Sequence, residues 1–404
     1  MACSGGGRQG LKEAQEYPED FDGYAVGHPP WLLSHLHPWV VYIGNANLDP
    51  KSDTYISPEL ISKLNGRVQT ICDSQDGVTD GIIISPWTCD FNSSQLLCED
   101  NNNTQSSCLA EAQLSTWDLL YNNWVDSTTN LISPPLMLGA DVSALTGSHV
   151  PSGFGTQYVE NFVMNNTKWN FSEISPWTVQ LADSINPGNS NAARYDLSAL
   201  RSANAKIIHY HGLADPLIPP AFSIYYNEQV AKTMYPDDAT ALQDFYRLFL
   251  VPGMYHCRES AGAPWYFAGG GQQVVGANNS VPGYSDSQHD ILLAVMDWVE
   301  NGTAPNSIIA TKYHNDTVSQ GVYKQMPLCP YPQQAQYIGN DVNDATSWVC
   351  SNGTSMNLPE MAIEPQGSIA LKGSTTTSTA VMHSIPSYLT LSISLLLVFS
   401  VIVF

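Results

Sequence analysis

Eight cysteines constrain the fold of this chain more than any other residue type. They stand at Cys3, Cys72, Cys89, Cys98, Cys108, Cys257, Cys329 and Cys350. The number is even, and no two of them form a Cys-x-x-Cys pair of the kind that binds zinc or carries out redox exchange. The pattern favours disulfide bonds, which form in an oxidising compartment and restrict the segments that they join.

Charge and composition exclude two broad classes of protein. The chain has 37 Asp and Glu against 15 Lys and Arg, a formal net charge of −22, whereas a nucleic-acid-binding surface needs a basic footprint. Hydrophobic residues make up 43% of the chain and aromatic residues 10%, which excludes general disorder. With 404 residues, the chain is long enough for about two or three domains.

Glycosylation sequons favour the secretory pathway, although chance matches in an Asn-rich chain are the alternative. The Asn-x-Ser/Thr pattern occurs at Asn92, Asn102, Asn165, Asn170, Asn278, Asn301, Asn315 and Asn352. Residues 1–20 contain no apolar stretch of the kind found in a signal peptide. We therefore expect a secreted protein from which an N-terminal part is missing.

The C-terminal residues have the order of a glycosylphosphatidylinositol (GPI) attachment signal. Residues 388–404 (YLTLSISLLLVFSVIVF) are uncharged and apolar, and at about 1.5 Å per residue they fall slightly short of a hydrocarbon core. A Ser/Thr-rich spacer and small residues around Gly373 and Ser374 precede them. The prediction is a surface protein held to the membrane only by that anchor. An uncleaved tail anchor or a misassigned final exon would also explain these residues.

Strand and helix patterns alternate from residue 205 onward. KIIHYHGLADPLIPP (206–220) and FYRLFLVPGMYHC (245–257) are short apolar runs that end in loops. Helical patterns follow them at 221–234 and 287–299. This alternation predicts an α/β fold with a mostly parallel sheet, in which functional residues lie at the carboxyl ends of the strands. Asp215 and His256 stand at those ends.

Residues 1–200 show weaker periodicity. A helical pattern covers 8–20, and shorter ones occur at 57–64 and 109–121. From about residue 31 to 200 the chain is rich in Asn, Ser, Trp and Tyr and contains four of the cysteines. We expect an irregular insertion stapled by disulfides.

Ser4, Asp215 and His256 could provide a nucleophile, an acid and a base. They follow the chain order of the α/β-hydrolase triad. The sequence Ala-Cys-Ser-Gly-Gly at 2–6 is close to the Gly-x-Ser-x-Gly elbow, with Ala2 in the first glycine position. A serine among glycines is also typical of a flexible loop.

Two cysteines flank this candidate site, because Cys3 precedes Ser4 and Cys257 follows His256. If they are bridged, their Cα atoms lie about 5.5 Å apart. Such a bridge would hold the serine and the histidine side by side.

Three separated motifs resemble those of the fungal tannase and feruloyl esterase family. They are CSGGGRQGLKEAQEYPEDFDG (3–23), HGLADPLI (211–218) and FYRLFLVPGMYHC (245–257), and the likeness runs from residue 2 to about 350. The resemblance implies a serine esterase with an α/β-hydrolase core and a large inserted lid. It implies Ser4 as nucleophile, Asp215 as the orienting acid, and His256 as general base and then acid.

The implied substrates are small phenolic esters, feruloyl (hydroxycinnamoyl) or galloyl, free or attached to plant polysaccharide or tannin. The resemblance also implies a disulfide between Cys3 and Cys257 and further pairs Cys72–Cys89, Cys98–Cys108 and Cys329–Cys350. The predicted domains are a hydrolase core formed by residues 1–32 and 201–350 and a lid domain at 33–200. A polar linker at 351–373 and the Ser/Thr-rich spacer with the GPI-type signal at 374–404 follow.

An acidic loop follows Cys72. Composition alone allows a solvated turn, and the spacing is not that of an EF-hand. The resemblance implies a structural calcium ion in the lid, with hard oxygen ligands from Asp73, Asp76, Asp80 and the backbone carbonyls of Val78 and Ile82.

Two His-x-His pairs, His35/His37 and His209/His211, could each place two imidazoles on one face of a strand. No third zinc ligand accompanies either pair, so structural roles are favoured.

Only three residues precede Ser4, although an α/β-hydrolase nucleophile follows a strand that has other strands before it. We expect the strand that feeds the elbow, the earlier strands and one oxyanion loop to be absent, which leaves the Gly5 amide as oxyanion donor. Two other hypotheses remain open. One is a truncated, inactive calcium-binding glycoprotein of the cell surface, and the other is a cell-wall adhesin.

Overall fold

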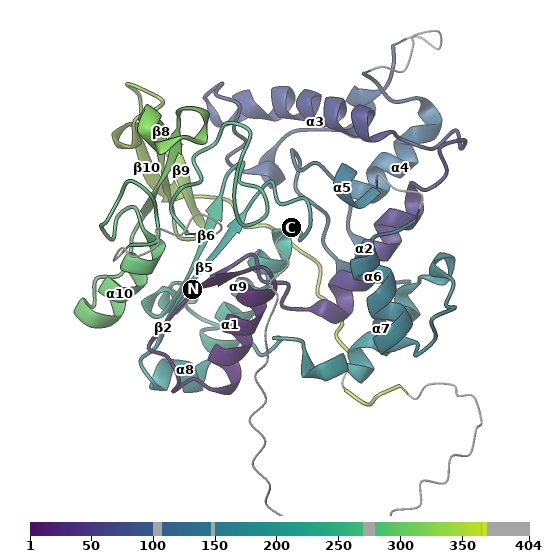
Figure 1. Ribbon diagram of the computed structural model, residues 1–404, viewed down its shortest axis with the longest axis horizontal. Coiled ribbons are helices and arrows are strands. Elements are labelled where there is room, and N and C mark those ends of the chain that lie inside the picture. The colour runs from purple at the N-terminus through teal and green to yellow at the C-terminus, as the bar shows by residue number, and fades with distance from the viewer. Residues whose placement is uncertain (100–106, 147–149, 270–278, 365, 370–404) are drawn as a thin grey trace, which may run out of the picture. The chain divides into compact units, whose positions relative to one another are not determined.

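Four parallel strands form the sheet on which the computed structural model is built. The strands are β1 (Ala2–Cys3), β2 (Gly23–Gly27), β5 (Lys206–Gly212) and β6 (Tyr246–Val251), side by side in that order (Figure 1). The predicted α/β fold with a parallel sheet is confirmed, as are the buried strands β5 and β6. Strand β2 was not predicted.

The structure describes residues 1–99, 107–146, 150–269, 279–364 and 366–369. Residues 1–369 form one compact unit, whose predicted boundaries at 32, 200 and 350 remain predictions. None of the helices in the described ranges combines the length and the apolar character needed to cross a membrane. The predicted spacer and GPI signal and the sequons at Asn102 and Asn278 lie outside the described residues.

Helices cover both faces of the sheet (Figure 1). α1 (Gly5–Glu16) and α9 (Ala221–Met234) pack on one face, and α10 (Ile291–Asn301) packs on the other. Alternate residues of a strand point to opposite faces. Tyr24 and Val26 of β2 accordingly join the cluster with α1 and α9, while Ala25 joins the cluster with α10.

The segment between β2 and β5 is mainly helical. It contains the antiparallel pair β3 (Trp124–Val125) and β4 (Leu131–Ser133), and the helices α2 (Leu33–Ala46), α3 (Pro58–Asp73), α4 (Glu111–Tyr121), α5 (Ser143–Thr146), α6 (Gly153–Tyr158), α7 (Pro176–Ile185) and α8 (Ser198–Ser202). Helix α3 begins where its sequence predicts, because the Ser57 hydroxyl accepts a hydrogen bond from the Leu60 N–H and Pro58 occupies the first helical position.

The last part of the unit consists of two antiparallel hairpins, β7 (Ile308–Tyr313) with β8 (Val322–Leu328), and β9 (Gln333–Tyr337) with β10 (Trp348–Asn352). The cysteines form the four disulfides that the resemblance implied, Cys3–Cys257, Cys72–Cys89, Cys98–Cys108 and Cys329–Cys350.

A close backbone approach joins α1 to β2. A Cβ atom on Gly7 would lie 2.2 Å from the carbonyl oxygen of Gly27, and the same oxygen accepts the Ser4 N–H at 2.9 Å. Only glycine allows α1 to pack this near to the strand.

We predict that Gly7→Ala lowers the free energy of unfolding by about 1–3 kcal/mol, because the added methyl group must displace backbone. The matched control is Gly66→Ala. Gly66 lies inside α3 with open space around its Cβ position, so we expect this change to raise stability by roughly 0.5–1 kcal/mol. Denaturant unfolding of both variants measures the difference. If both variants changed the free energy of unfolding equally, the close approach of α1 to β2 would not be what requires glycine at position 7.

Candidate active site

The structure brings together the three side chains that the sequence singles out. Ser4 follows β1, Asp215 follows β5, and His256 follows β6, so all three lie at the carboxyl edge of the parallel sheet. Ser4 Oγ lies 2.9 Å from His256 Nε2, and His256 Nδ1 lies 2.8 Å from Asp215 Oδ2. This continuous line of hydrogen bonds is the arrangement of a serine nucleophile, its base and the orienting acid.

Ser4 occupies a sharp turn between β1 and α1. Its φ of 59° and ψ of −129° lie in a region that a non-glycine residue rarely adopts. The expectation that no strand feeds this elbow is wrong for its last two residues, because Ala2 and Cys3 pair with β2. The Ala2 methyl group is accommodated because Gly6 has no side chain, and a Cβ there would lie 3.1 Å from it.

The disulfide between Cys3 and Cys257 joins the turn that carries Ser4 to the loop that carries His256. The two Cα atoms are 6.0 Å apart although 254 residues separate them in the chain. Because each cysteine is the immediate neighbour of a triad residue, the bond restricts the distance between Ser4 and His256.

Asp215 is completely buried and yet remains an anion. Burial acts to raise its pKa, but the interactions with His256, His211 and His28 outweigh burial and hold the pKa well below its usual range. The other carboxylate oxygen, Oδ1, accepts the backbone N–H groups of Leu217 at 2.8 Å and Ile218 at 3.1 Å.

His28 is a site residue that the sequence analysis missed. It follows β2 directly, and its Nδ1 lies 2.7 Å from Asp215 Oδ2. The signal was available, because identifying GYAVG at 23–27 as a strand would have placed His28 at the same carboxyl edge as Asp215 and His256.

A cavity of about 290 Å³ opens beside the serine. Ser4, Gly5, Arg8, His37 and His256 line part of it. Its apolar wall consists of Pro30, Leu33, Leu36, Val40, Leu145, Phe154, Leu217 and Ile218. Gly5 is the first residue of α1, so its N–H has no acceptor within the helix and can bind a developing oxyanion.

Neither His-x-His pair is arranged as a zinc site. His209 and His211 lie on β5 as predicted, and both contact the Ser223 hydroxyl. The strand prediction for His35 and His37 was wrong, because both lie on helix α2. Within the described ranges, the groups close enough to share a metal ion are His28, Asp215 and His256, and the nitrogens of both histidines that face Asp215 hydrogen-bond its carboxylate.

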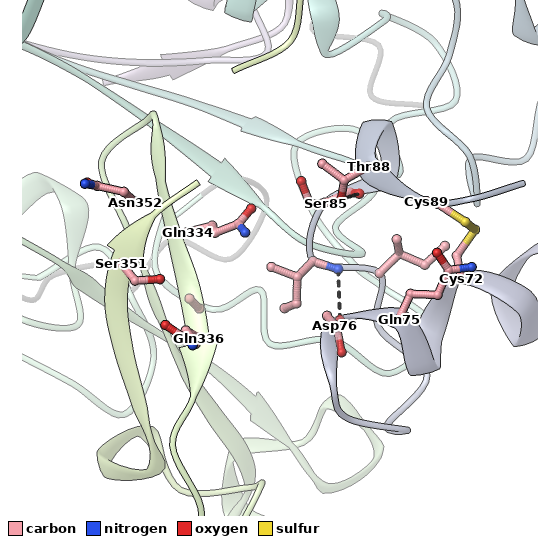
Figure 2. Close-up of a pocket in the computed structure, with 13 residues that line it drawn as sticks. Cys72, Gln75, Asp76, Ser85, Thr88, Cys89, Gln334, Gln336, Ser351 and Asn352 are labelled. Carbon is pink, nitrogen blue, oxygen red and sulfur yellow. Dashed lines mark hydrogen bonds between the residues drawn. A yellow bond between two sulfur atoms is a disulfide. The ribbon is translucent and has the colours of Figure 1, made fainter. Parts of the chain in front are cut away.

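The acidic loop after Cys72 contains the carboxylates of Asp73, Asp76 and Asp80, and Figure 2 shows Asp76 lining a pocket together with the Cys72–Cys89 disulfide. Asp73 Oδ1 accepts three backbone N–H groups, from Asp80, Gly81 and Ile82, at 2.9–3.2 Å. Burial and, to a smaller extent, the nearby Asp80 and Asp73 carboxylates together raise the pKa of Asp76 to about 6.

Lys324 pairs with one of these carboxylates, that of Asp80. Three carboxylates and one ammonium group leave a net charge of 1 − 3 = −2 at this loop. Oxygen donors and a net negative charge are what a hard divalent cation such as Ca²⁺ prefers, but in this structure the carboxylates of Asp73, Asp76 and Asp80 do not all lie as close together as the groups that could share an ion.

Comparison with known proteins identifies the family. The family model described as tannase and feruloyl esterase matches residues 1–133 and 148–351. The chain belongs to the tannase and feruloyl esterase family. The resemblance predicted from the three motifs is thereby confirmed.

Curated members of the tannase and feruloyl esterase family resemble this chain over most of its length. "Probable feruloyl esterase B-1" of Aspergillus flavus is 32% identical over 355 residues, and the protein of the same name from Aspergillus terreus is 33% identical over 359 residues. Each match covers 87% of this chain and 65% of the relative. The chain thus spans about two thirds of the length of these relatives.

Solved structures of the family show the same fold. An esterase from Aspergillus oryzae matches with a TM-score of 0.78 and 31% identity, covering 86% of this chain and 68% of that one. Feruloyl esterase B from Aspergillus oryzae matches with a TM-score of 0.78 and 28% identity, covering 86% and 67%. Tannin acyl hydrolase from Aspergillus niger, at 23% identity and a TM-score of 0.69 with 87% and 63% covered, shares the fold.

The buried histidines predict how stability depends on pH. Burial lowers the pKa of His28 to about 3 and that of His37 to about 4, whereas the unfolded chain titrates near pH 6.5. The stability that each contributes is therefore complete above about pH 6.5 and is lost as the pH falls toward the folded value.

Between about pH 6 and 4, we expect the free energy of unfolding to fall by about 1.4 kcal/mol per pH unit for each such histidine. Denaturant unfolding in a series of buffers measures the slope. His28→Asn removes one titrating group and should reduce the slope by about that amount. Identical slopes in the two proteins would show that His28 does not titrate this way.

Proposed function

We propose that this chain is a serine carboxylic ester hydrolase that cleaves phenolic-acid esters. The observation that carries the proposal is the hydrogen-bonded line Ser4–His256–Asp215 beside an apolar cavity. Membership of the tannase and feruloyl esterase family agrees with it.

In the proposed mechanism each side chain has one role. Ser4 Oγ attacks the ester carbonyl carbon while its proton passes to His256 Nε2, and the Gly5 N–H binds the oxyanion. His256 then gives that proton to the leaving alcohol, which leaves the acyl group on Ser4. In the second half, water gives a proton to His256 and a hydroxyl group to the acyl carbon. The acid departs and Ser4 regains its proton.

Asp215 holds His256 in the required tautomer. Its carboxylate accepts the Nδ1–H at 2.8 Å, which leaves Nε2 free to act as the base. It also stabilises the imidazolium that forms during transfer.

The cavity favours an aromatic acyl group. Five of its apolar residues, Leu33, Leu36, Val40, Leu145 and Phe154, come from the segment 33–200, which we propose acts as a lid over the site. An aromatic ring buried there would lose contact with water while the carbonyl carbon reaches Ser4. Relatives named feruloyl esterase suggest feruloyl or other hydroxycinnamoyl esters, and the tannase branch suggests galloyl esters, either free or linked to plant polysaccharide or tannin.

The direct test is hydrolysis of methyl ferulate and methyl gallate by the purified chain. We expect release of the free acid, and Ser4→Ala should lower kcat by roughly 10³-fold or more, because no other group in the line can form the acyl-enzyme. Ser202→Ala, at an exposed position in α8, is the matched control and should keep full activity. A folded wild-type chain that cleaves neither ester would favour the inactive glycoprotein hypothesis.

We also propose that the acidic loop binds a structural calcium ion through Asp73, Asp76, Asp80 and the carbonyls of Val78 and Ile82. The ion would supply positive charge that offsets the repulsion among the three carboxylates. The loop continues directly from α3 and is tied to Cys89 by a disulfide, so bound calcium would stiffen the end of that helix.

Calcium should therefore stabilise the fold. At a free calcium concentration of about 100 times Kd, we expect the free energy of unfolding to exceed the value in chelator by about 2.7 kcal/mol. Asp73→Asn keeps an oxygen acceptor for the three N–H groups but removes the charge, and should abolish most of this increment. Asp53→Asn, an exposed position outside the loop, should retain it. Equal stability with calcium and with chelator would disprove the site.

We propose secretion, with a GPI anchor at the cell surface. Four disulfides suit an oxidising compartment. The described sequon asparagines are all exposed, as glycan attachment requires, namely Asn92, Asn165, Asn170, Asn301, Asn315 and Asn352.

A further inference from the structure

Behind the Asp215–His256 pair lie buried histidines that the proposed mechanism does not use. Asp215 Oδ2 faces three imidazoles, with His28 Nδ1 at 2.7 Å, His256 Nδ1 at 2.8 Å and His211 Nε2 at 3.2 Å. His28 and His211 are both completely buried. The acid of the triad therefore has two nitrogen donors besides the base that it orients.

The partners of His28 fix the position of its proton. A carboxylate oxygen only accepts hydrogen bonds, so the Nδ1 atom that faces Asp215 carries the hydrogen. The other ring nitrogen, Nε2, accepts the N–H of Gly212 at 3.2 Å. His28 is accordingly a neutral imidazole, and burial keeps it neutral by lowering its pKa to about 3.

His211 is the end of a longer hydrogen-bonded chain. Its Nε2–H faces Asp215 and the carbonyl of Ile218 at 3.1 Å, and its Nδ1 lies 2.6 Å from the Ser223 hydroxyl. Ser223 Oγ lies 2.8 Å from His209 Nε2, and His209 Nδ1 lies 2.7 Å from the Tyr246 hydroxyl.

One direction satisfies every group in this chain when its histidines are neutral. Tyr246 donates to His209, His209 donates to Ser223, Ser223 donates to His211, and His211 donates to Asp215. Each donor thus points toward the carboxylate, from helix α9 and from strands β5 and β6.

We propose that His28 and His211 are positioning residues, which hold Asp215 as an anion in one orientation so that Oδ2 always faces His256 Nδ1. This inference rests on the proposed esterase function. Neutral N–H donors suit the task better than a lysine or arginine would. A fixed positive charge would also repel the imidazolium that forms on His256, whereas a neutral dipole weakens the attraction between the Asp215 carboxylate and that imidazolium much less.

Loss of the His28 donor has two expected consequences. The carboxylate gains freedom to rotate, which lowers kcat, and it binds the His256 imidazolium more strongly, which raises the pKa of His256. In the plot of kcat/KM against pH, the fall in activity on the acid side (the acid limb) reports the pKa of His256. The titratable groups that face Asp215 and His256 are His28, His211 and, across the cavity, Arg8 and His37. The last three are unchanged when His28 is replaced.

His28→Ala and His28→Asn in the full chain make a matched pair. His28 has a φ of 44°, which asparagine tolerates better than most residues, and the asparagine amide can still donate to Asp215. With methyl ferulate, we expect His28→Ala to lower kcat by roughly 10- to 100-fold with little change in KM and to move the acid limb to higher pH. His28→Asn should restore most of kcat and return the limb to its wild-type position.

A second variant tests the hydrogen-bonded chain at Tyr246, which is the member farthest from Asp215, and leaves the triad unchanged. Tyr246→Phe removes the hydroxyl that donates to His209 and should lower kcat several-fold in the same direction as His28→Ala. Tyr195→Phe is its control, because the Tyr195 hydroxyl is buried and has no hydrogen-bond partner, and it should keep wild-type kcat.

Imidazole NMR separates failure of this inference from failure of the proposed function, since it needs no substrate. In wild-type protein we expect the proton of His28 on Nδ1, and in His28→Ala a raised pKa for His256. A folded His28→Ala protein with wild-type kcat, or with an unchanged His256 pKa, would overturn the inference even if the chain hydrolyses esters. An inactive wild-type chain that shows the expected tautomer and pKa change would support the inference and refute the esterase.

Discussion

The buried carboxylate of Asp215 is the charge around which the carboxyl edge of the sheet is organised. An isolated anion in a protein interior is strongly unfavourable, and it persists only when donors replace its lost hydration. Two backbone N–H groups satisfy one oxygen of Asp215, and three imidazoles surround the other. Those imidazoles come from three different strand ends, so this one side chain fixes how β2, β5 and β6 present their following loops to each other.

Backbone contacts and a disulfide extend that organisation to the nucleophile. The carbonyl of Gly27 accepts the Ser4 N–H at 2.9 Å, and the absence of a side chain at Gly7 lets α1 approach the same carbonyl. The Cys3–Cys257 bond then joins the turn that carries Ser4 to the loop that carries His256. The strained backbone of Ser4 is thus held from both sides, by β2 through hydrogen bonds and by the loop after β6 through a covalent link.

The cavity beside Ser4 takes its polar side and its apolar wall from different parts of the fold. Its polar side belongs to the triad and to the start of α1, whereas most of its apolar wall comes from α2, α5 and α6 of the segment between β2 and β5. Changes in that wall would alter which acyl group fits without moving Asp215, His256 or Ser4. The family model is described as tannase and feruloyl esterase, and the curated relatives are named feruloyl esterases.

The sequence by itself determined the local features. The apolar runs that became β5 and β6, the helical patterns at 221–234 and 57–64, and the order Ser4, Asp215, His256 all follow from short-range patterns and motifs. Only the tertiary structure decided which distant groups meet. Strand β2 is five residues long and contains two glycines, so its strand pattern is weak, and the position of His28 at its end became clear only in the folded structure. The hydrogen-bonded chain from Tyr246 to Asp215 likewise depends on the parallel register of β5 and β6 and on the packing of α9, which no local pattern specifies.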